Sequence, residues 1–162
     1  MGFVRKQNRL NNYDYSQPGY YFVTACTKDR KEYFGSVNIG KIDLSEMGKV
    51  VEEVWKRTPK LYKIVDIDEF VVMPNHLHGI VIIKPGEQAG GLRYSLDQIA
   101  GSFKNVVTKF IRKQFIPDFA WQPSFYDHVI RKEEGLDKIR EYIRNNPLKW
   151  ELDRNNLENL WM

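Results

Sequence analysis

The sequence predicts an α+β sandwich, in which helices pack against an antiparallel sheet. Runs of β-branched and aromatic residues alternate along the chain with segments whose apolar residues recur at helical spacing. The two longest apolar strands, expected at 65–73 and 76–83, are separated only by Pro74-Asn75, which indicates a hairpin. The 162 residues suit one domain with a substantial core, which we expect to span 1–162.

The composition indicates the cellular compartment of the protein and the class of its partners. The chain has 25 basic and 21 acidic residues, a net charge of +4, and 14% of its residues are aromatic. Cations and exposed rings are compatible with single-stranded nucleic acid, whose phosphates and unstacked bases they contact. No apolar run approaches the ~18 residues of a membrane span, and the polar N-terminus lacks the apolar stretch of a secretory signal. With a single cysteine, Cys26, the chain is expected to be cytoplasmic and to have no membrane partner.

The N-terminal part of the chain is expected to hold an arm, a strand and a hairpin. Residues 1–15 are polar and basic, which favours a flexible arm. Residues 19–27 are rich in Tyr, Phe, Val and Thr, and they predict the first strand. Gly35 and Gly40 then indicate a short strand or hairpin between 33 and 42.

The first helix is expected to begin at Asp43. Glu46 follows three residues later, which resembles a capping box, and apolar residues continue at helical spacing. This helix is expected to end near Thr58-Pro59, because the residue before a proline disfavours helical backbone.

A second helix follows the two long strands. Ser95 and Gln98 form another capping box at its start. Its expected core stripe comprises Leu96, Ile99, Phe103, Val106 and Phe110. A further strand is expected over 125–131.

The last helix is expected to begin at Glu133 and to stop at Asn145-Asn146-Pro147, followed by a polar tail over 148–162. The full order is then β-α-β-β-α-β-α. This is the split β-α-β arrangement of ferredoxin-like folds, with an additional C-terminal helix. In such a sheet the strand at 76–83 occupies an inner position.

Two of the three histidines, His76 and His78, stand two residues apart on an expected strand. A period of two places both imidazoles on one face of the sheet and Leu77 on the opposite, core-facing side. Neutral imidazoles are common metal ligands, so the pair can converge on one divalent ion, but a metal centre needs at least a third ligand. The last helix offers Asn146, whose amide oxygen suits Mg²⁺ or Mn²⁺, with Tyr142 one turn away on the same face.

Four blocks of the sequence occur in an order that resembles the REP-associated tyrosine transposases. The blocks are Met73-Pro74-Asn75-His76-Leu77-His78, Ser102-Phe103-Lys104, Trp121 to Arg131, and Tyr142-Ile143-Arg144-Asn145-Asn146-Pro147. This family belongs to the HUH (His-hydrophobic-His) nucleases of single-stranded DNA and is akin to the single-tyrosine transposases of small insertion sequences. The likeness covers most of residues 15–150.

The resemblance implies a ferredoxin-like core that binds single-stranded DNA with palindromic hairpins and cuts beside the hairpin. It also implies a divalent metal ion, Mg²⁺ or Mn²⁺, held by the two histidines and a polar residue of the last helix. The helix tyrosine would attack the scissile phosphate, leaving a 5′-phosphotyrosine bond and a free 3′-OH. The expected activity is therefore that of a metal-dependent, transposase-like endonuclease and strand transferase.

Site residues carry over from the family by position. His76 and His78 match the histidine pair, Tyr142 matches the nucleophile, and Asn146 matches the third ligand. Related insertion-sequence enzymes carry Gln at this last position, so the shorter Asn146 leaves direct ligation open. His128 lies in a family-like block and is either a supplementary ligand or a phosphate contact. Tyr126 is the alternative nucleophile, although the placement of Tyr142 one helical turn from Asn146 favours Tyr142.

Basic residues in the arm, on two helices and beyond the last strand are candidates for contacts with DNA phosphates. They are Arg5, Lys6, Arg9, Lys104, Lys109, Arg112, Arg131 and Arg144. Insertion-sequence relatives act as dimers that exchange tyrosine helices, whereas REP-associated members include monomers, so a homodimer stays open.

Two other functions fit parts of the same sequence. One is a hairpin-binding protein with the same fold and no cleavage, but intact His76, His78 and Tyr142 favour the enzyme. The other is a histidine-triad nucleotide hydrolase. It is set aside because Gly79 and Ile80 follow His78, where a third histidine would be required.

Overall fold

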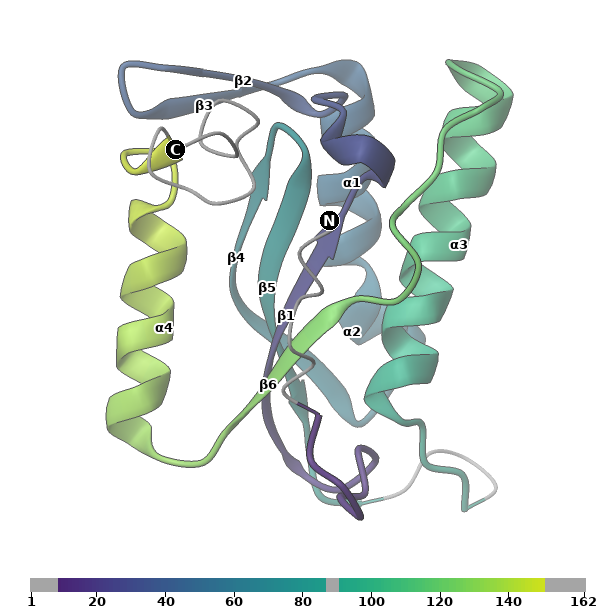
Figure 1. Cartoon of the computed structure of the whole chain (residues 1–162). Helices are drawn as coiled ribbons and strands as arrows, with labels where there is room; N and C mark the ends of the chain where they lie inside the picture. Colours follow the sequence, from purple (N-terminus) through teal and green to yellow (C-terminus); the bar gives the residue numbers. More distant parts are fainter. Residues whose placement is uncertain (1–8, 87–90, 151–162) are drawn as a thin grey trace.

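The computed structural model describes residues 9–86 and 91–150, and a sheet with helices on both faces stands at its centre (Figure 1). The strands of this sheet are β1 (Gly19–Cys26), β4 (Val65–Met73), β5 (His76–Ile83) and β6 (Tyr126–Ile130). The helices are α1 (Glu46–Lys56), α2 (Thr58–Leu61), α3 (Leu96–Gln114) and α4 (Glu133–Asn145), with a 3-10 turn at Lys28–Arg30.

The strand order is β4-β5-β1-β6, and each neighbouring pair is antiparallel. Helices α1 and α3 cover one face of the sheet and α4 lies on the other (Figure 1). This order and these connections confirm the predicted ferredoxin-like α+β fold with an additional C-terminal helix. In the described part of the chain, no helix is both long enough and apolar enough to cross a membrane.

The central hairpin has the predicted bounds, with Pro74-Asn75 between β4 and β5. Strand β5 is buried along nearly its whole length because neighbouring strands flank it and helices cover both faces. At Gly79, a Cβ atom would come within 2.5 Å of the Trp55 indole, so the absence of a side chain there lets α1 pack closely on the sheet.

A separate hairpin precedes α1, which is one of the two alternatives expected from the sequence. It consists of β2 (Gly35–Asn38) and β3 (Lys41–Leu44). The two residues between them, Ile39 and Gly40, have φ of 51° and 70°, which is typical of a type I′ turn.

The predicted start of the first helix was wrong. Asp43 pairs with Ser36 inside the β2–β3 hairpin, and Ser45 is the N-cap of α1, accepting a hydrogen bond from the Gly48 N–H at 3.1 Å. The break near Thr58 is confirmed, but a short helix, α2, follows it. Pro59 lies in the first turn of α2, where a missing N–H leaves no helical bond unmade.

The capping box at the start of α3 is confirmed, whereas its predicted core stripe is only partly right. Leu96, Ile99 and Phe103 are buried. Val106 and Phe110 are instead 44% and 47% exposed, and Val107 and Ile111 are the buried residues of the later turns.

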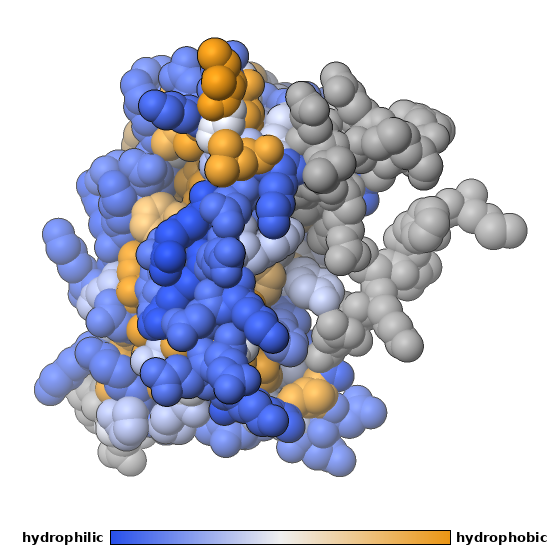
Figure 2. All heavy atoms as spheres, turned by 90° about the vertical axis from the view of Figure 1, so that its left-hand side faces the viewer, coloured by the Kyte–Doolittle hydropathy of each residue, from blue (hydrophilic) through white to orange (hydrophobic). Residues whose placement is uncertain are grey.

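Helix α4 closes the second face of the sheet. Its apolar side, including Leu136 and Ile143, packs on Phe22 and Ile80, and the helix begins and stops where predicted. Figure 2, which views the molecule from this side, shows that its outer surface is mostly hydrophilic. The second face of the sheet is therefore partly apolar, and the two histidines also lie on it.

Two arginines attach α4 to the edge strand β4. A register shift between Ile67 and Phe70 marks a bulge in β4. Within it, Asp68 accepts two hydrogen bonds from the Arg140 guanidinium, at 2.6 and 3.0 Å, and Glu69 pairs with Arg144 at 3.1 Å. The hydrogen bonds from Arg140 lower the pKa of Asp68.

Candidate functional site

The imidazoles of His76 and His78 meet on the sheet face that α4 covers. Strand β5 directs both rings to this face and Leu77 to the opposite core, in the way that the period of two predicts. The two Nε2 atoms are 3.1 Å apart, and both side chains are buried. Two ligands about 2.1 Å from one ion and at right angles to each other are about 3 Å apart, so the pair has the spacing of neighbouring ligands.

The other nitrogen of each ring has a fixed partner. The Asn75 amide donates to the Arg30 carbonyl, which turns its oxygen toward His76; that oxygen accepts from His76 Nδ1 at 2.7 Å. His78 Nδ1 lies 2.7 Å from the Thr24 hydroxyl, which can accept or donate. With Nδ1 protonated on both rings, both Nε2 lone pairs are available to an ion. Outer partners of this kind are typical of metal-binding histidines.

Three residues of α4 and the turn after it are spaced four apart beside the histidine pair. The Tyr142 ring lies 5.4 Å from the His78 ring, between centroids. The Trp150 ring stacks on His76 at 6.2 Å and 20°. Asn146 is midway between them in sequence, and the helical spacing places it over the same part of the site.

The side chain of Asn146 carries an unusual buried acceptor. The residue is 2% exposed, and its Oδ1 accepts no hydrogen bond from any residue that the structure describes. Leaving such an atom unsatisfied costs roughly 1–3 kcal/mol. A ligand at this oxygen would offset that cost.

These donors fit a divalent cation. Residues 9–86 and 91–150 contain no group of three or more His, Cys, Asp or Glu side chains suited to a metal. The candidate set is therefore two imidazoles and the Asn146 amide, which leaves positions for substrate phosphate oxygens. Mixed nitrogen and oxygen ligands of this kind suit Mn²⁺ or Mg²⁺.

The two other sequence-predicted candidates lie farther along the same sheet face. Tyr126 is in register with Thr24, one strand beyond the Thr24–His78 hydrogen bond. His128 is in register with Phe22, is exposed, and lies on β6, two strands from His78. The Tyr142 ring thus lies against the His78 ring, whereas Tyr126 lies on the same sheet face, two strands from His78.

Most of the described basic candidates already have partners within the chain. The Arg9 guanidinium pairs with Asp97 and Asp127, and burial raises the pKa of Asp127. Lys104 donates to two backbone carbonyls, and burial lowers its pKa.

Arg112 donates to the Phe119 carbonyl, and Arg144 pairs with Glu69. Lys109 and Arg131 are exposed. Arg5 and Lys6 lie outside the described residues, as does Trp161 of the predicted tail.

Three residues of the site were not predicted as site residues from the sequence. Asn75 was assigned only to the turn, although its position directly before His76 was a signal. Thr24 orients His78 across a strand pair, and only the register reveals this. Trp150 lies in the segment that the sequence predicts as a polar tail, and the structure places its ring on His76.

Comparisons with known proteins identify the family of the chain. The family model described as "Transposase IS200 like" matches residues 16–146. An uncharacterized protein of Haemophilus influenzae is 35% identical over 93% of this chain and 92% of its own length. A second protein of the same organism, provisionally named a REP-associated tyrosine transposase, is 23% identical over 86% of this chain and 77% of its own length.

Two solved structures share the fold. One is a REP-associated tyrosine transposase bound to a REP hairpin, with a TM-score of 0.59 and 19% identity over 89% of this chain and 74% of that one. The other is a protein of Deinococcus radiodurans R1 provisionally described as a transposase, with a TM-score of 0.53 and 16% identity over 86% of this chain and 96% of that one.

Proposed function

The chain belongs to the IS200-like transposase family, and from this premise we propose that it is a metal-dependent endonuclease and strand transferase of single-stranded DNA. One observation carries the proposal. The Nε2 atoms of His76 and His78 lie 3.1 Å apart, and the phenol ring of Tyr142 packs directly on one of these rings. The two proposed metal ligands and the proposed nucleophile are therefore side by side on one sheet face.

We assign the nucleophilic role to Tyr142. Its phenol oxygen attacks the scissile phosphorus and forms a phosphotyrosine bond, and the bond from phosphorus to the 3′ oxygen breaks. The phenol proton passes to solvent, and the leaving 3′ oxygen takes up a proton from solvent. The products are a 5′-phosphotyrosine adduct and a DNA end with a free 3′-OH. Attack by such a 3′-OH on the adduct reverses the reaction and rejoins a strand, so no external energy source is required.

His76, His78 and Asn146 are the residues that would hold the ion. A bound divalent cation would neutralise charge on the scissile phosphate and favour ionisation of a phenol whose ordinary pKa is about 10. Asn75 and Thr24 orient the imidazoles, and the Trp150 ring stacks on the His76 ring.

We propose hairpin DNA as the substrate. A structural relative is a transposase bound to a REP hairpin. Of the basic residues named from the sequence, Lys109 and Arg131 are exposed, and we assign them to phosphate contacts. Arg9, Lys104, Arg112 and Arg144 are engaged within the chain, so their contribution to DNA binding is expected to be smaller.

A covalent-adduct assay tests the proposal. Labelled hairpin oligonucleotides with single-stranded flanks are incubated with the protein and Mg²⁺ or Mn²⁺, denatured, and separated by electrophoresis. We expect a protein–DNA adduct with the wild type and with Tyr126→Phe, and none with Tyr142→Phe. An adduct that survives Tyr142→Phe and disappears in Tyr126→Phe would transfer the role to Tyr126. Hairpin binding without an adduct in any cation would establish the non-cleaving binding protein instead.

A further inference from the structure

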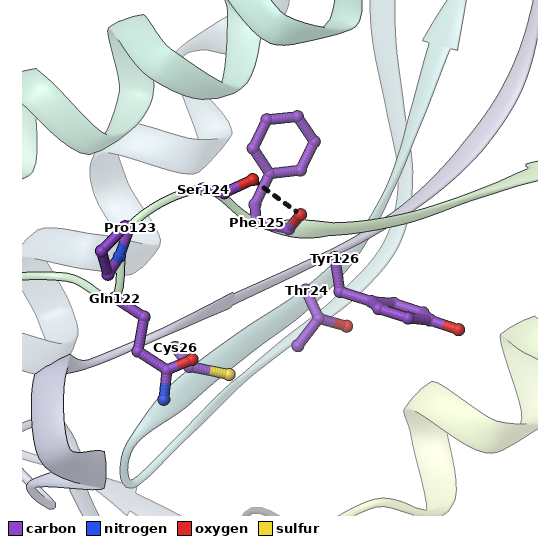
Figure 3. A pocket seen from close by; sticks show the side chains of 7 residues that line it. All are labelled: Thr24, Cys26, Gln122, Pro123, Ser124, Phe125 and Tyr126. Carbon is purple, nitrogen blue, oxygen red and sulfur yellow. Dashed lines mark hydrogen bonds between the residues drawn. The ribbon is translucent and has the colours of Figure 1, made fainter. Parts of the chain in front are cut away.

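A pocket of about 140 Å³ opens on the sheet face that carries the histidine pair. Figure 3 shows the side chains that line it. Thr24 and Cys26 of β1 and the loop residues 122–126 line it. The proposed catalytic steps leave this pocket without a role. One of its lining residues, Thr24, also holds His78 through a hydrogen bond, so the pocket adjoins the candidate metal site.

The position of the pocket is set by strand register. Thr24 pairs with His78 on one side and with Tyr126 on the other. Neighbouring strands are about 4.8 Å apart, so the Tyr126 backbone lies about 10 Å from that of His78. A nucleotide joined to a phosphate at the histidines can span this distance.

The side chains that face the pocket suit a nucleobase. Figure 3 shows Gln122, Cys26, Thr24 and Tyr126 on one side of the loop, whereas the Phe125 ring points away from them. The Gln122 amide offers a donor and an acceptor together, and its side chain makes no hydrogen bond to another described residue. Tyr126 supplies an aromatic ring. Unpaired bases are bound by stacking on such rings and by hydrogen bonds along their edges.

The loop that carries Gln122 is held in place before any ligand binds. The Lys104 ammonium donates to the carbonyls of Gln122 and Ser124, at 2.9 and 2.6 Å, and the Gln122 N–H donates to the Cys26 carbonyl at 2.8 Å. Ser124 has φ of 67°, a left-handed conformation that non-glycine residues rarely adopt and that often occurs at functional sites. A preformed pocket loses less conformational entropy on binding than a mobile loop.

We infer that this pocket binds one unpaired base of a single-stranded DNA, adjacent to the phosphate at the histidine pair, and that Gln122 reads that base while Tyr126 stacks on it. The inference rests on the proposed function for the identity of the ligand. A glutamine amide pairs in a bidentate manner with adenine, so adenine is the base we expect to be preferred. The pocket would thus select the nucleotide beside the cut, while the hairpin is bound elsewhere.

The test measures DNA binding without cleavage. The probes are hairpin oligonucleotides with single-stranded flanks, in which each flank position in turn is A, C, G or T. Their affinities are measured by fluorescence anisotropy in a Tyr142→Phe background. We expect one flank position where adenine binds at least about fivefold more tightly than the other bases. Gln122→Ala should reduce this preference to less than about twofold and leave binding of the hairpin without flanks unchanged.

A second probe reports on stacking, and a matched variant controls for the substitution. With 2-aminopurine at the selected position, fluorescence should be quenched by the background protein and by Tyr126→Phe, but not by Tyr126→Leu. Gln114→Ala, an exposed glutamine at the end of α3, should retain the base preference in full.

The outcomes distinguish failure of the inference about the pocket from failure of the proposed function. Tight hairpin binding with equal affinity for all four bases, or with a preference that Gln122→Ala does not alter, overturns the pocket alone. Failure to bind any oligonucleotide overturns the pocket and the proposed function together.

Discussion

The Thr24 hydroxyl determines which nitrogen of His78 faces the other imidazole. It lies 2.7 Å from Nδ1, and it comes from a neighbouring strand that is rigidly paired with β5. Replacing it with a methyl group of equal size would leave the ring packed but unoriented. The affinity of the pair for an ion should therefore depend on this hydroxyl as well as on the imidazoles themselves.

We expect Thr24→Val to weaken Mn²⁺ binding about tenfold, because loss of such an outer partner typically costs 10–100-fold in metal affinity. Isothermal titration calorimetry with the ion alone measures this. Thr24→Ser keeps the hydroxyl and should bind the ion nearly as the wild type does. Equal affinities for Thr24→Val and the wild type would show that the hydroxyl has no orienting role.

Alanine substitutions at two glycines should change the free energy of unfolding in opposite directions. A Cβ at Gly79 would lie 2.5 Å from the Trp55 indole, whereas a Cβ at Gly101 of α3 would have no neighbour within 4 Å. Gly79→Ala should destabilise the fold by about 1–3 kcal/mol through overpacking. Gly101→Ala should stabilise it by about 0.5–1 kcal/mol, because alanine loses less conformational entropy in a helix. Urea denaturation of both variants checks the two signs, and a stabilising Gly79→Ala would mean that the indole moves away easily.

Among the elements, α4 positions Tyr142, and its attachment to β4 depends on charge. The bulge in β4 turns Asp68 and Glu69 toward Arg140 and Arg144. The Asp68–Arg140 pair is bidentate and largely shielded from solvent, which makes it the stronger of the two contacts. The orientation of the helix over the histidines is thus fixed by its apolar side and by this pair.

The lowered pKa of Asp68 gives the pair a defined pH dependence. A carboxyl whose pKa is lower in the folded than in the unfolded state stabilises the fold above its unfolded pKa of about 3.9, and this contribution is lost as the pH falls through the folded pKa. Asp68→Asn should therefore lower the free energy of unfolding by about 1 kcal/mol at pH 7. The difference between variant and wild type should shrink below about pH 4, as measured by urea denaturation across pH. A difference that persists unchanged at pH 3 would assign the effect to packing.

Sequence patterns predicted those elements whose signals are local. The bounds of β4 and β5 were predicted to the residue. Two apolar runs flank Pro74-Asn75, and this pair is the turn signal between them. The start of α1 was mispredicted because Asp43 and Ser45 are both good caps, and the choice between them depends on the β2–β3 hairpin.

The remaining errors and omissions have a tertiary cause. In α3, both Phe110 and Ile111 fit a helical stripe after Phe103, and the packing of α3 against the sheet decides which is buried. The predictions for the site show the same difference between local patterns and tertiary contacts. The period of two and the helical spacing predicted that the imidazoles share a face and that Tyr142 and Asn146 lie together. The contacts of Thr24 and Trp150 depend on register and on a turn, which no local pattern specifies.

On the scale of the whole molecule, the two faces of the sheet differ in the side chains that they carry. The face under α1 and α3 holds the larger hydrophobic core, and the face under α4 holds the smaller core together with the histidine pair and the pocket. The question for the assembled protein is therefore whether each chain completes its own site.

The connection between β6 and α4 indicates that it does. Strand β6 ends at Ile130 and α4 begins at Glu133, so the two residues between them can bridge at most about 11 Å. Within the same chain, α4 pairs with β4 through Arg140 and places Tyr142 against His78. Exchange of α4 with a second copy would require breaking these contacts and extending a connection that is already short.

Mixing two inactive variants distinguishes the arrangements. Tyr142→Phe retains the histidines and His76→Ala retains the tyrosine, so a site built from two chains would be restored in mixed dimers. We expect the mixture, incubated with labelled hairpin DNA and Mn²⁺, to form no covalent adduct, since neither chain has both halves. A co-purified pair carrying two different tags ensures that any dimers are mixed, and circular dichroism of each variant confirms that it is folded. An adduct that appears only in the mixture would show that α4 is exchanged between subunits and that the contacts between α4 and β4 form across an interface.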